Sequence, residues 1–218
     1  MYYNKPSGPE STIRRHPERA AYDRATIDAI LDEGIVAHAG LVADGRPYVL
    51  PMLYARDGDR LYLHGSPASR LLGTFTAGAS VCLTVTLVDG LVLARSAFRH
   101  SLNYRSVVVL GEARRVVDAD EKLAALAAIV DHILAGRSQE VRGPSEAELK
   151  VTEVVALDLD RASAKVRTGP PADNPSDYGV PAWAGELPLS LAAGDPIPDS
   201  RCSIPAPPSL HGYGRRHA

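Results

Sequence analysis

The sequence has little cysteine. Of its 218 residues only Cys82 and Cys202 are cysteines, and they stand in unrelated settings, an apolar run and a Pro-rich tail. No CxxC or HExxH motif occurs, and no other cluster has the spacing of metal ligands. A disulfide framework needs several cysteines, and a structural zinc site needs closely spaced Cys or His ligands. The sequence therefore predicts neither, and we expect no metal site.

Long apolar runs and an excess of positive charge are also missing. No uninterrupted apolar stretch approaches the ~20 residues that a membrane-spanning helix needs, and the polar start "MYYNKPSGPES" does not resemble a signal peptide. The formal charge is −2 and the pI is near 6.4, which is not typical of a nucleic-acid binder. Neither GxGxxG nor GxxxxGK is present, which disfavours Rossmann and P-loop nucleotide sites. We expect a cytoplasmic protein that binds neither membranes nor nucleic acid.

The hydrophobic content of 45% and the length fit one globular domain with tails. Residues 1–13 are rich in Pro, Ser and Gly and predict a flexible N-terminal tail. The Pro-rich segment 195–218 predicts a disordered C-terminal tail. The folded domain is therefore expected over 14–194.

The periodicity of apolar residues predicts a mixture of helices and short strands. Helical spacing predicts helices over 16–34, 69–78 and 119–136, and alternation predicts strands within 35–66, 80–98, 104–118 and 148–169. Asp-Gly pairs in "ADGRP" and "RDGDR" predict hairpins, and a third at Asp89-Gly90 predicts a turn. Gly111 within a strand predicts a bulge or a close backbone approach. This pattern favours a small β-barrel of the α+β type.

Three polar stretches are candidates for a functional site. In "LYLHGSPASRLL" a strand leads into His64, Gly65 and Ser66, and Ser69 with Arg70 opens a helix. Hydroxyls and a guanidinium gathered there suit a phosphate. The alternative is a capped helix whose Arg70 is solvated.

The second candidate, "RPYVLPMLYAR", has Pro51 inside a strand-like run. Pro cannot donate to the hydrogen-bond ladder, so Pro51 predicts an edge, a bulge or a ligand-facing position. Backbone groups beside it could bond a planar heterocycle. An ordinary edge strand explains the same letters equally well.

The third candidate, "FRHSLNYRSVVVLG", places His100 just before an apolar strand. Histidine has an ordinary pKa suited to proton transfer near neutrality. No Asp or Glu lies within the stretch to orient it, so a structural or solvated histidine is the alternative. Trp183, the single tryptophan, is either a packing anchor or a shield for a flavin ring.

Taken in order, these stretches resemble the pyridoxamine 5'-phosphate oxidase-related FMN-binding split-barrel proteins, and among them the branch that includes the nitroimidazole reductases. The resemblance runs from Arg14 to Pro198. It implies an α+β fold, an antiparallel six-stranded split β-barrel, which forms a homodimer with two FMN sites at the subunit interface.

The resemblance also implies roles for individual residues. Backbone contacts to the flavin ring would come from Val49, Leu50, Pro51 and Met52, contacts to the ribityl chain and phosphate from His64, Gly65, Ser66, Ser69 and Arg70, and further flavin contacts from Arg105, Ser106 and Trp183. His100 matches a histidine near the flavin and is the candidate catalytic residue. Ser106 replaces a Gln of the oxidases proper, and the C-terminal arm lacks their substrate motif, so vitamin B6 oxidation is not expected.

The function implied is an FMN-dependent oxidoreductase that passes electrons from a reduced donor to a small acceptor such as a nitroaromatic or a quinone. His100 would donate a proton to that acceptor. Two alternatives stay open. One is a non-catalytic flavin-binding or flavin-buffering protein. The other is a split barrel that carries deazaflavin or haem, with His64 or His100 as the axial ligand.

Overall fold

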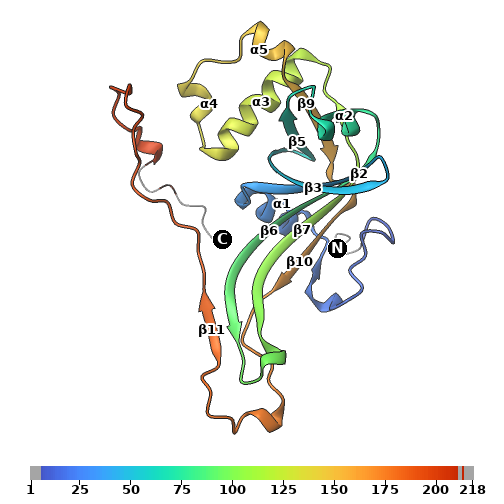
Figure 1. The fold of residues 1–218 in the computed structure, drawn as a ribbon, viewed down its shortest axis with the longest axis vertical. Helices are drawn as coiled ribbons and strands as arrows, with labels where there is room; N and C mark the ends of the chain where they lie inside the picture. Colours follow the sequence, from blue (N-terminus) through green and yellow to red (C-terminus); the bar gives the residue numbers. More distant parts are fainter. Residues whose placement is uncertain (1–5, 211–212, 214–218) are drawn as a thin grey trace. The chain divides into compact units, whose positions relative to one another are not determined.

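The chain folds into two compact units, shown as a ribbon in Figure 1. The computed structural model describes residues 6–210 and 213. Unit 1 contains Met1–Gly34, Thr84–Val109 and Arg161–Ser190, and unit 2 contains Ile35–Leu83, Leu110–Asp160 and Leu191–Ala218. The expected domain over 14–194 stays a prediction. The expected tails lie partly outside the described residues, at 1–5, 211–212 and 214–218.

Unit 1 is built on an antiparallel sheet. Its strands follow the order β1 (Ala20–Ala21), β10 (Ala162–Arg167), β7 (Ser101–Glu112) and β6 (Ser80–Leu93), and β11 (Gly185–Pro188) also pairs with β6. β6 begins in unit 2 and β7 ends there. The strands predicted over 80–98 and 104–118 are thus present, and the arm after Gly169 contributes a strand of its own.

The helix predicted over 16–34 is shorter than expected. Pro17 begins a single 3-10 turn, Ala20–Ala21 pairs with β10, and the helix α1 spans Arg24–Glu33. Its start is fixed by Asp23, whose carboxylate accepts a hydrogen bond from the Thr26 amide at 2.8 Å. Such a cap satisfies an amide that has no partner within the helix, so the helix begins after Asp23.

The turn predicted at Asp89-Gly90 is wrong, because β6 runs without interruption from Ser80 to Leu93. Asp89 accepts two hydrogen bonds from Arg105 on β7. Gly90 lies opposite Pro188 of β11, and a Cβ there would come 3.0 Å from the Leu187 carbonyl oxygen. Partners on neighbouring strands therefore hold the pair extended, and the glycine permits a close backbone approach.

Unit 2 contains a hairpin of β2 (Val36–Ala43) and β3 (Arg46–Leu53), as the sequence predicted. Asp44 and Gly45 form its two-residue turn with φ angles of 50° and 71°, the left-handed values that a tight hairpin requires. β3 is the last strand of its sheet, which confirms the edge position expected for Pro51.

A second sheet of unit 2 has the order β4 (Ala55–Asp57), β5 (Arg60–Gly65), β9 (Glu153–Asp158) and β8 (Arg114–Arg115). Gly111 lies within β7, and a Cβ there would come 2.8 Å from Cδ1 of Leu157, so the close neighbour of this glycine is a side chain rather than the predicted backbone. The single strand expected over 148–169 is instead the end of a helix followed by β9 and β10. A 3-10 turn at Leu159–Arg161 separates them, held by the Leu159 amide that donates to the Asp59 carbonyl at 2.9 Å.

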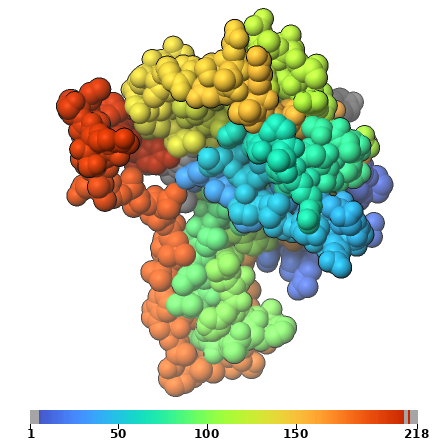
Figure 2. Space-filling view, turned by 45° about the horizontal axis from the view of Figure 1, so that its top comes forward, coloured from blue at the N-terminus to red at the C-terminus, as the bar shows by residue number. Residues whose placement is uncertain are grey.

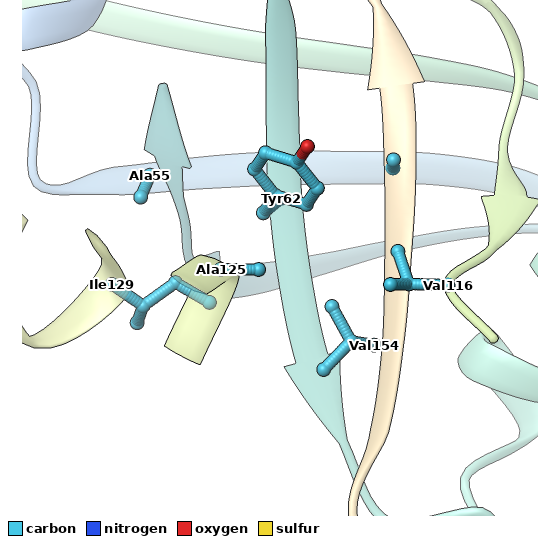
Figure 3. Close-up of a cluster of buried hydrophobic side chains, with 7 residues drawn as sticks. Ala55, Tyr62, Val116, Ala125, Ile129 and Val154 are labelled. Carbon is cyan, nitrogen blue, oxygen red and sulfur yellow. The ribbon is translucent and has the colours of Figure 1, made fainter. Parts of the chain in front are cut away.

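The helices of unit 2 are α2 (Arg70–Thr76), α3 (Ala119–Ile133), α4 (Arg137–Glu140) and α5 (Glu146–Lys150). Asp118 caps α3, because its carboxylate accepts from the Glu121 amide at 2.8 Å. Figure 3 shows Ala125 and Ile129 of α3 beside Tyr62 of β5 and Val154 of β9. This apolar cluster attaches α3 to the four-stranded sheet.

Short 3-10 helices lie at Pro17–Arg19, Ala97–Arg99, Leu159–Arg161, Pro175–Asp177 and Pro208–Leu210. In Figure 2 the red C-terminal segment of unit 2 lies beside the yellow helices, and Tyr213 Oη donates to the Ile133 carbonyl at 3.0 Å. No helix among the described residues is both long and apolar enough to cross a membrane. The architecture is a mixed α+β fold with mostly antiparallel strands, which confirms the predicted fold class.

Candidate functional site

β5 directs His64 toward a cavity beside α3. Side chains two residues apart on a strand share a face, and Tyr62 of this strand packs against α3, so His64 lies on the same face. The cavity has a volume of about 470 Å³. Its apolar wall includes Leu123, Leu126, Ala127, Ile129 and Val130 of α3.

The imidazole of His64 is half-buried, and its Nδ1 atom is enclosed without a hydrogen-bond partner among the described residues. Burial lowers the pKa of His64 below its ordinary value, because the charged form loses its hydration. The ring is therefore neutral at pH 7. A neutral imidazole is the form that binds a metal ion through a ring nitrogen.

Other polar groups around the cavity already have partners. Ser138 donates its hydroxyl hydrogen to Asp131 at 2.7 Å, and the Thr152 hydroxyl donates to the Glu148 carbonyl at 2.8 Å. A buried polar atom without a partner costs free energy, so native structures keep few of them. Nδ1 of His64 is the side-chain atom of this lining that is buried without a partner among the described residues.

An ion pair, Arg142 with Glu148, completes the lining of the cavity. Arg142 donates from Nη1 to Glu148 Oε2 at 2.8 Å and from Nη2 to Oε1 at 2.7 Å, and the two side chains are 72% and 48% exposed. The pair lowers the pKa of Glu148 to about 2, with further help from hydrogen bonds to Ser145. The cavity thus combines an apolar wall, a neutral imidazole and a solvated guanidinium.

A second group of predicted residues meets at β3 and the start of α2. Arg70 donates from Nη1 to the Tyr48 hydroxyl at 2.8 Å, and its Cζ lies 5.1 Å from the centre of the Tyr48 ring. Ser69 precedes α2 but makes no side-chain cap bond, and the Ser66 hydroxyl accepts from the Ala68 amide at 3.2 Å. Arg70 is therefore a positioned cation beside the strand that the sequence assigned to the flavin ring.

The outer part of β3 is exposed and apolar. Val49 and Leu50 are 66% and 42% exposed, Pro51 is exposed, and Met52 is half-buried. β3 belongs to the light-blue surface in Figure 2. Apolar side chains concentrated on an edge strand indicate a surface that something covers.

In unit 1, Arg105 is held by two carboxylates. It donates to both oxygens of Glu33 at 2.6 and 2.8 Å and to both oxygens of Asp89 at 3.0 and 2.9 Å. These hydrogen bonds raise the pKa of Arg105 above its ordinary value, so it stays charged. Ser106 donates to the Lys165 carbonyl at 3.4 Å. The flavin contacts of Arg105 and Ser106 stay predictions.

His100 and Trp183 also belong to unit 1, and both are exposed. Nδ1 of His100 lies 3.0 Å from the Ser96 carbonyl oxygen. A carbonyl can only accept, so Nδ1 carries the hydrogen of this bond and Nε2 is the other ring nitrogen. Trp183 is 69% exposed, and a Cβ at Gly185 would come 2.9 Å from its ring.

The predicted residues therefore fall into groups. Unit 2 brings Arg70 next to β3, but His64 adjoins a different feature, the cavity under α3. His100, Arg105, Ser106 and Trp183 belong to unit 1. Among the described residues no group of three or more His, Cys, Asp or Glu side chains could hold a metal ion.

Sequence reasoning missed Arg142, Glu148 and Tyr48. The letters "SEAE" from Ser145 to Glu148 match a capping box, and the structure forms both of its hydrogen bonds. That pattern could have located α5. The partnership of Arg142 with Glu148, and of Tyr48 with Arg70, joins residues whose separation along the chain gave no signal.

Comparison with known proteins places this chain beside flavin- and haem-binding structures. A family model described as pyridoxamine 5'-phosphate oxidase matches residues 23–166. The structure of the flavocytochrome Anf3 from Azotobacter vinelandii is 39% identical, with a TM-score of 0.89, over 95% of this chain and 97% of that one. The FAD and heme binding protein from Mycobacterium smegmatis is 35% identical, with a TM-score of 0.85, over 90% and 97%.

A third similar structure is a putative 5-nitroimidazole antibiotic resistance protein from Bacteroides thetaiotaomicron. It is 24% identical, with a TM-score of 0.58, over 67% of this chain and 86% of that one, a likeness that concerns the fold alone. No curated protein matches the sequence. The likeness to these structures extends over nearly the whole chain for the first two and confirms the predicted split-barrel fold.

Proposed function

The chain belongs to the pyridoxamine 5'-phosphate oxidase family, and we propose that it is a redox protein that binds both a flavin nucleotide and haem. One observation carries this proposal: the enclosed, unpartnered nitrogen of His64 at the wall of an apolar cavity. The names of the two similar structures above, a flavocytochrome and an FAD and heme binding protein, support it.

The residues around His64 fit a haem. A proximal histidine holds the iron in many haem proteins, and the neutral ring of His64 has the required form. The cavity of about 470 Å³ lies within the roughly 300–1,000 Å³ of small-molecule sites, which are mostly apolar. His64 would bind the iron, and the α3 side chains would exclude water from the macrocycle.

The residues at β3 and α2 fit a flavin nucleotide. Arg70 would bind a phosphate oxygen, with Tyr48 orienting the guanidinium, and the exposed β3 backbone and side chains would support the flavin ring. The sequence predicts FMN, whereas one similar structure is named for FAD. Both FMN and FAD carry a phosphate that Arg70 could bind, so we propose a flavin nucleotide without choosing between the two.

When bound, a flavin accepts electrons in pairs and releases them singly, and a haem carries one electron at a time. The chain's own residues bind and orient these groups. Electrons would enter from a reduced donor, and the small acceptor predicted from the sequence would receive them. A flavin-binding protein without turnover is the alternative, and reduction by nicotinamide donors with a panel of acceptors separates the two.

A second copy of this chain is the proposed cover of β3. Val49, Leu50 and Leu53 are exposed on this edge strand, where another chain can pair or pack. Val49→Glu should lower the molar mass measured by sedimentation from that of a dimer to that of a monomer. Val151→Glu, a change at another 66% exposed valine, is the matched control and should leave the mass unchanged.

The proposed function is tested by what co-purifies with the full chain. We expect an absorbance spectrum with flavin bands and a haem Soret band, and mass spectrometry of the released flavin decides between FMN, FAD and deazaflavin. A colourless protein that takes up neither flavin nor haem would contradict the proposal. Uptake of flavin alone would remove the haem and leave the flavoprotein.

A further inference from the structure

We propose that Arg142 binds a carboxylate of the macrocycle in the His64 cavity and makes the cavity selective for haem that carries ionised carboxylates. This inference rests on the haem site proposed above. It assigns a specificity to a residue that neither the sequence motifs nor the family resemblance singled out.

The charge of the cavity lining is the first argument. Of the described residues that line it, Arg142 is the one with an arginine or lysine side chain. Haem is a largely apolar macrocycle. Its iron needs a ligand such as an imidazole nitrogen, and its two carboxylates need a cation or hydrogen-bond donors. The lining offers an apolar wall, an imidazole and a guanidinium, one for each part.

The hydrogen bonds of Arg142 are the second argument. Its Nη1 and Nη2 atoms form the edge that binds Glu148, and Nη1 also donates to the Gly143 carbonyl at 3.0 Å. Nε makes no hydrogen bond to the described residues. A guanidinium has five N–H donors in a planar fork, so the edge formed by Nε and Nη2 can hold a second carboxylate bidentately.

Glu148 supports this arrangement. It occupies one edge of the guanidinium and accepts from the Ser145 amide at 2.7 Å, so it fixes Arg142 to the start of α5. A guanidinium already held by one carboxylate loses less side-chain freedom when it binds another. Glu148 also offsets part of the positive charge, so Arg142 alone is expected to give a modest selectivity.

The test compares two ligands that differ only in their carboxylates. The full chain, freed of its haem, is titrated with iron protoporphyrin IX and with its dimethyl ester, and binding is followed by the Soret absorbance. Wild type should bind the acid about tenfold more tightly than the ester, the lower end of the range for a charge-assisted hydrogen bond. Arg142→Gln should bind both ligands with equal affinity.

The matched control is Arg137→Gln, which removes another exposed arginine paired with a glutamate and does not line the cavity. It should keep the tenfold preference. Arg142→Lys keeps the charge but lacks the planar fork, so it should retain only part of the preference for the acid over the ester. The same variant replaces Arg142→Gln in the test if the glutamine variant does not fold.

Equal affinity of wild type for acid and ester would overturn the inference and leave the haem site intact. A preference that persists in Arg142→Gln would overturn it as well, by moving the selectivity to another residue. If neither ligand binds to wild type, the haem part of the proposed function fails, and the inference fails with it. The three results are distinguishable in one set of titrations.

Discussion

His64 and His100, the two histidines that the sequence offers as possible axial ligands, lie in opposite surroundings. His64 borders an apolar cavity with an enclosed, unpartnered Nδ1. His100 is exposed, and its Nδ1 is bound to the Ser96 carbonyl. Each belongs to a different unit of the chain.

The difference separates two kinds of chemistry. Burial without a partner favours the neutral ring and leaves a lone pair for a metal, which suits His64 to ligation. At His100 the Ser96 carbonyl fixes the hydrogen on Nδ1, so Nε2 is the atom available for proton exchange with a substrate or water. In the proposed function His64 would hold a cofactor and His100 would move a proton.

The largest expected effect is the loss of haem on His64→Ala. Without the iron ligand, binding should weaken by at least about 100-fold, beyond the roughly 10- to 100-fold that even indirect supports of a metal ligand contribute. The measurement is a haem titration followed at the Soret band. His100→Ala is the control and should bind haem as wild type does. Equal haem affinity in His64→Ala would end the distinction between the two histidines.

The next effect concerns turnover in His100→Ala. If His100 protonates a small acceptor such as a nitroaromatic, its removal should slow steady-state reduction by about 100-fold, the lower end for general acid catalysis. Flavin and haem contents must match those of wild type. Unchanged turnover at matched cofactor content would exclude His100 from the reaction and would leave it as a solvated surface residue.

Arg70→Ala should weaken flavin binding by about tenfold to 100-fold, since a hydrogen bond to a charged phosphate is worth roughly 1.5–3 kcal/mol. Fluorescence quenching of added flavin measures the affinity. Arg137→Ala, another exposed arginine, is the control and should have no effect. Riboflavin, which lacks the phosphate, should bind wild type and Arg70→Ala equally. A loss of riboflavin affinity would mean that Arg70 supports the strand and not the phosphate.

Much of the fold follows from local signals in the sequence. The hairpins predicted in "ADGRP" and "RDGDR" are both confirmed. Each of these turns depends on residues that are neighbours in the chain and on a glycine that adopts a left-handed φ angle. Asp89-Gly90 has the same local signal as a turn, but partners on β7 and β11 override it.

Less of the candidate site could be predicted, because its properties are tertiary. The letters around His64 indicated a phosphate site, and the sequence could not show that a helix almost 60 residues later forms a cavity over that histidine. Nor could it show that Arg142 faces the same cavity. Arg70 was predictable as a cation at a helix start, yet its partner Tyr48 became visible only in the folded hairpin.

The smallest expected effect is a pH dependence of the stability of α5, which carries Glu148 at the rim of the His64 cavity. The pKa of Glu148 is lowered from about 4.5 to about 2 by Arg142 and Ser145. A lowered carboxyl pKa stabilises the folded state fully above the unfolded value near 4.5, and this contribution is lost as the pH falls toward 2.

Amide hydrogen exchange of α5 should therefore stay slow from pH 6 down to about pH 4 and become faster below it, after correction for the intrinsic pH dependence of exchange. Glu148→Gln removes the titrating group, so its α5 should exchange faster than that of wild type at pH 6 and change little as the pH falls. The amides of α3, whose cap at Asp118 is separate, provide the internal reference. A direct titration of the Glu148 carboxyl by NMR with a midpoint near 4.5 would contradict the ion pair that holds Arg142 at the cavity.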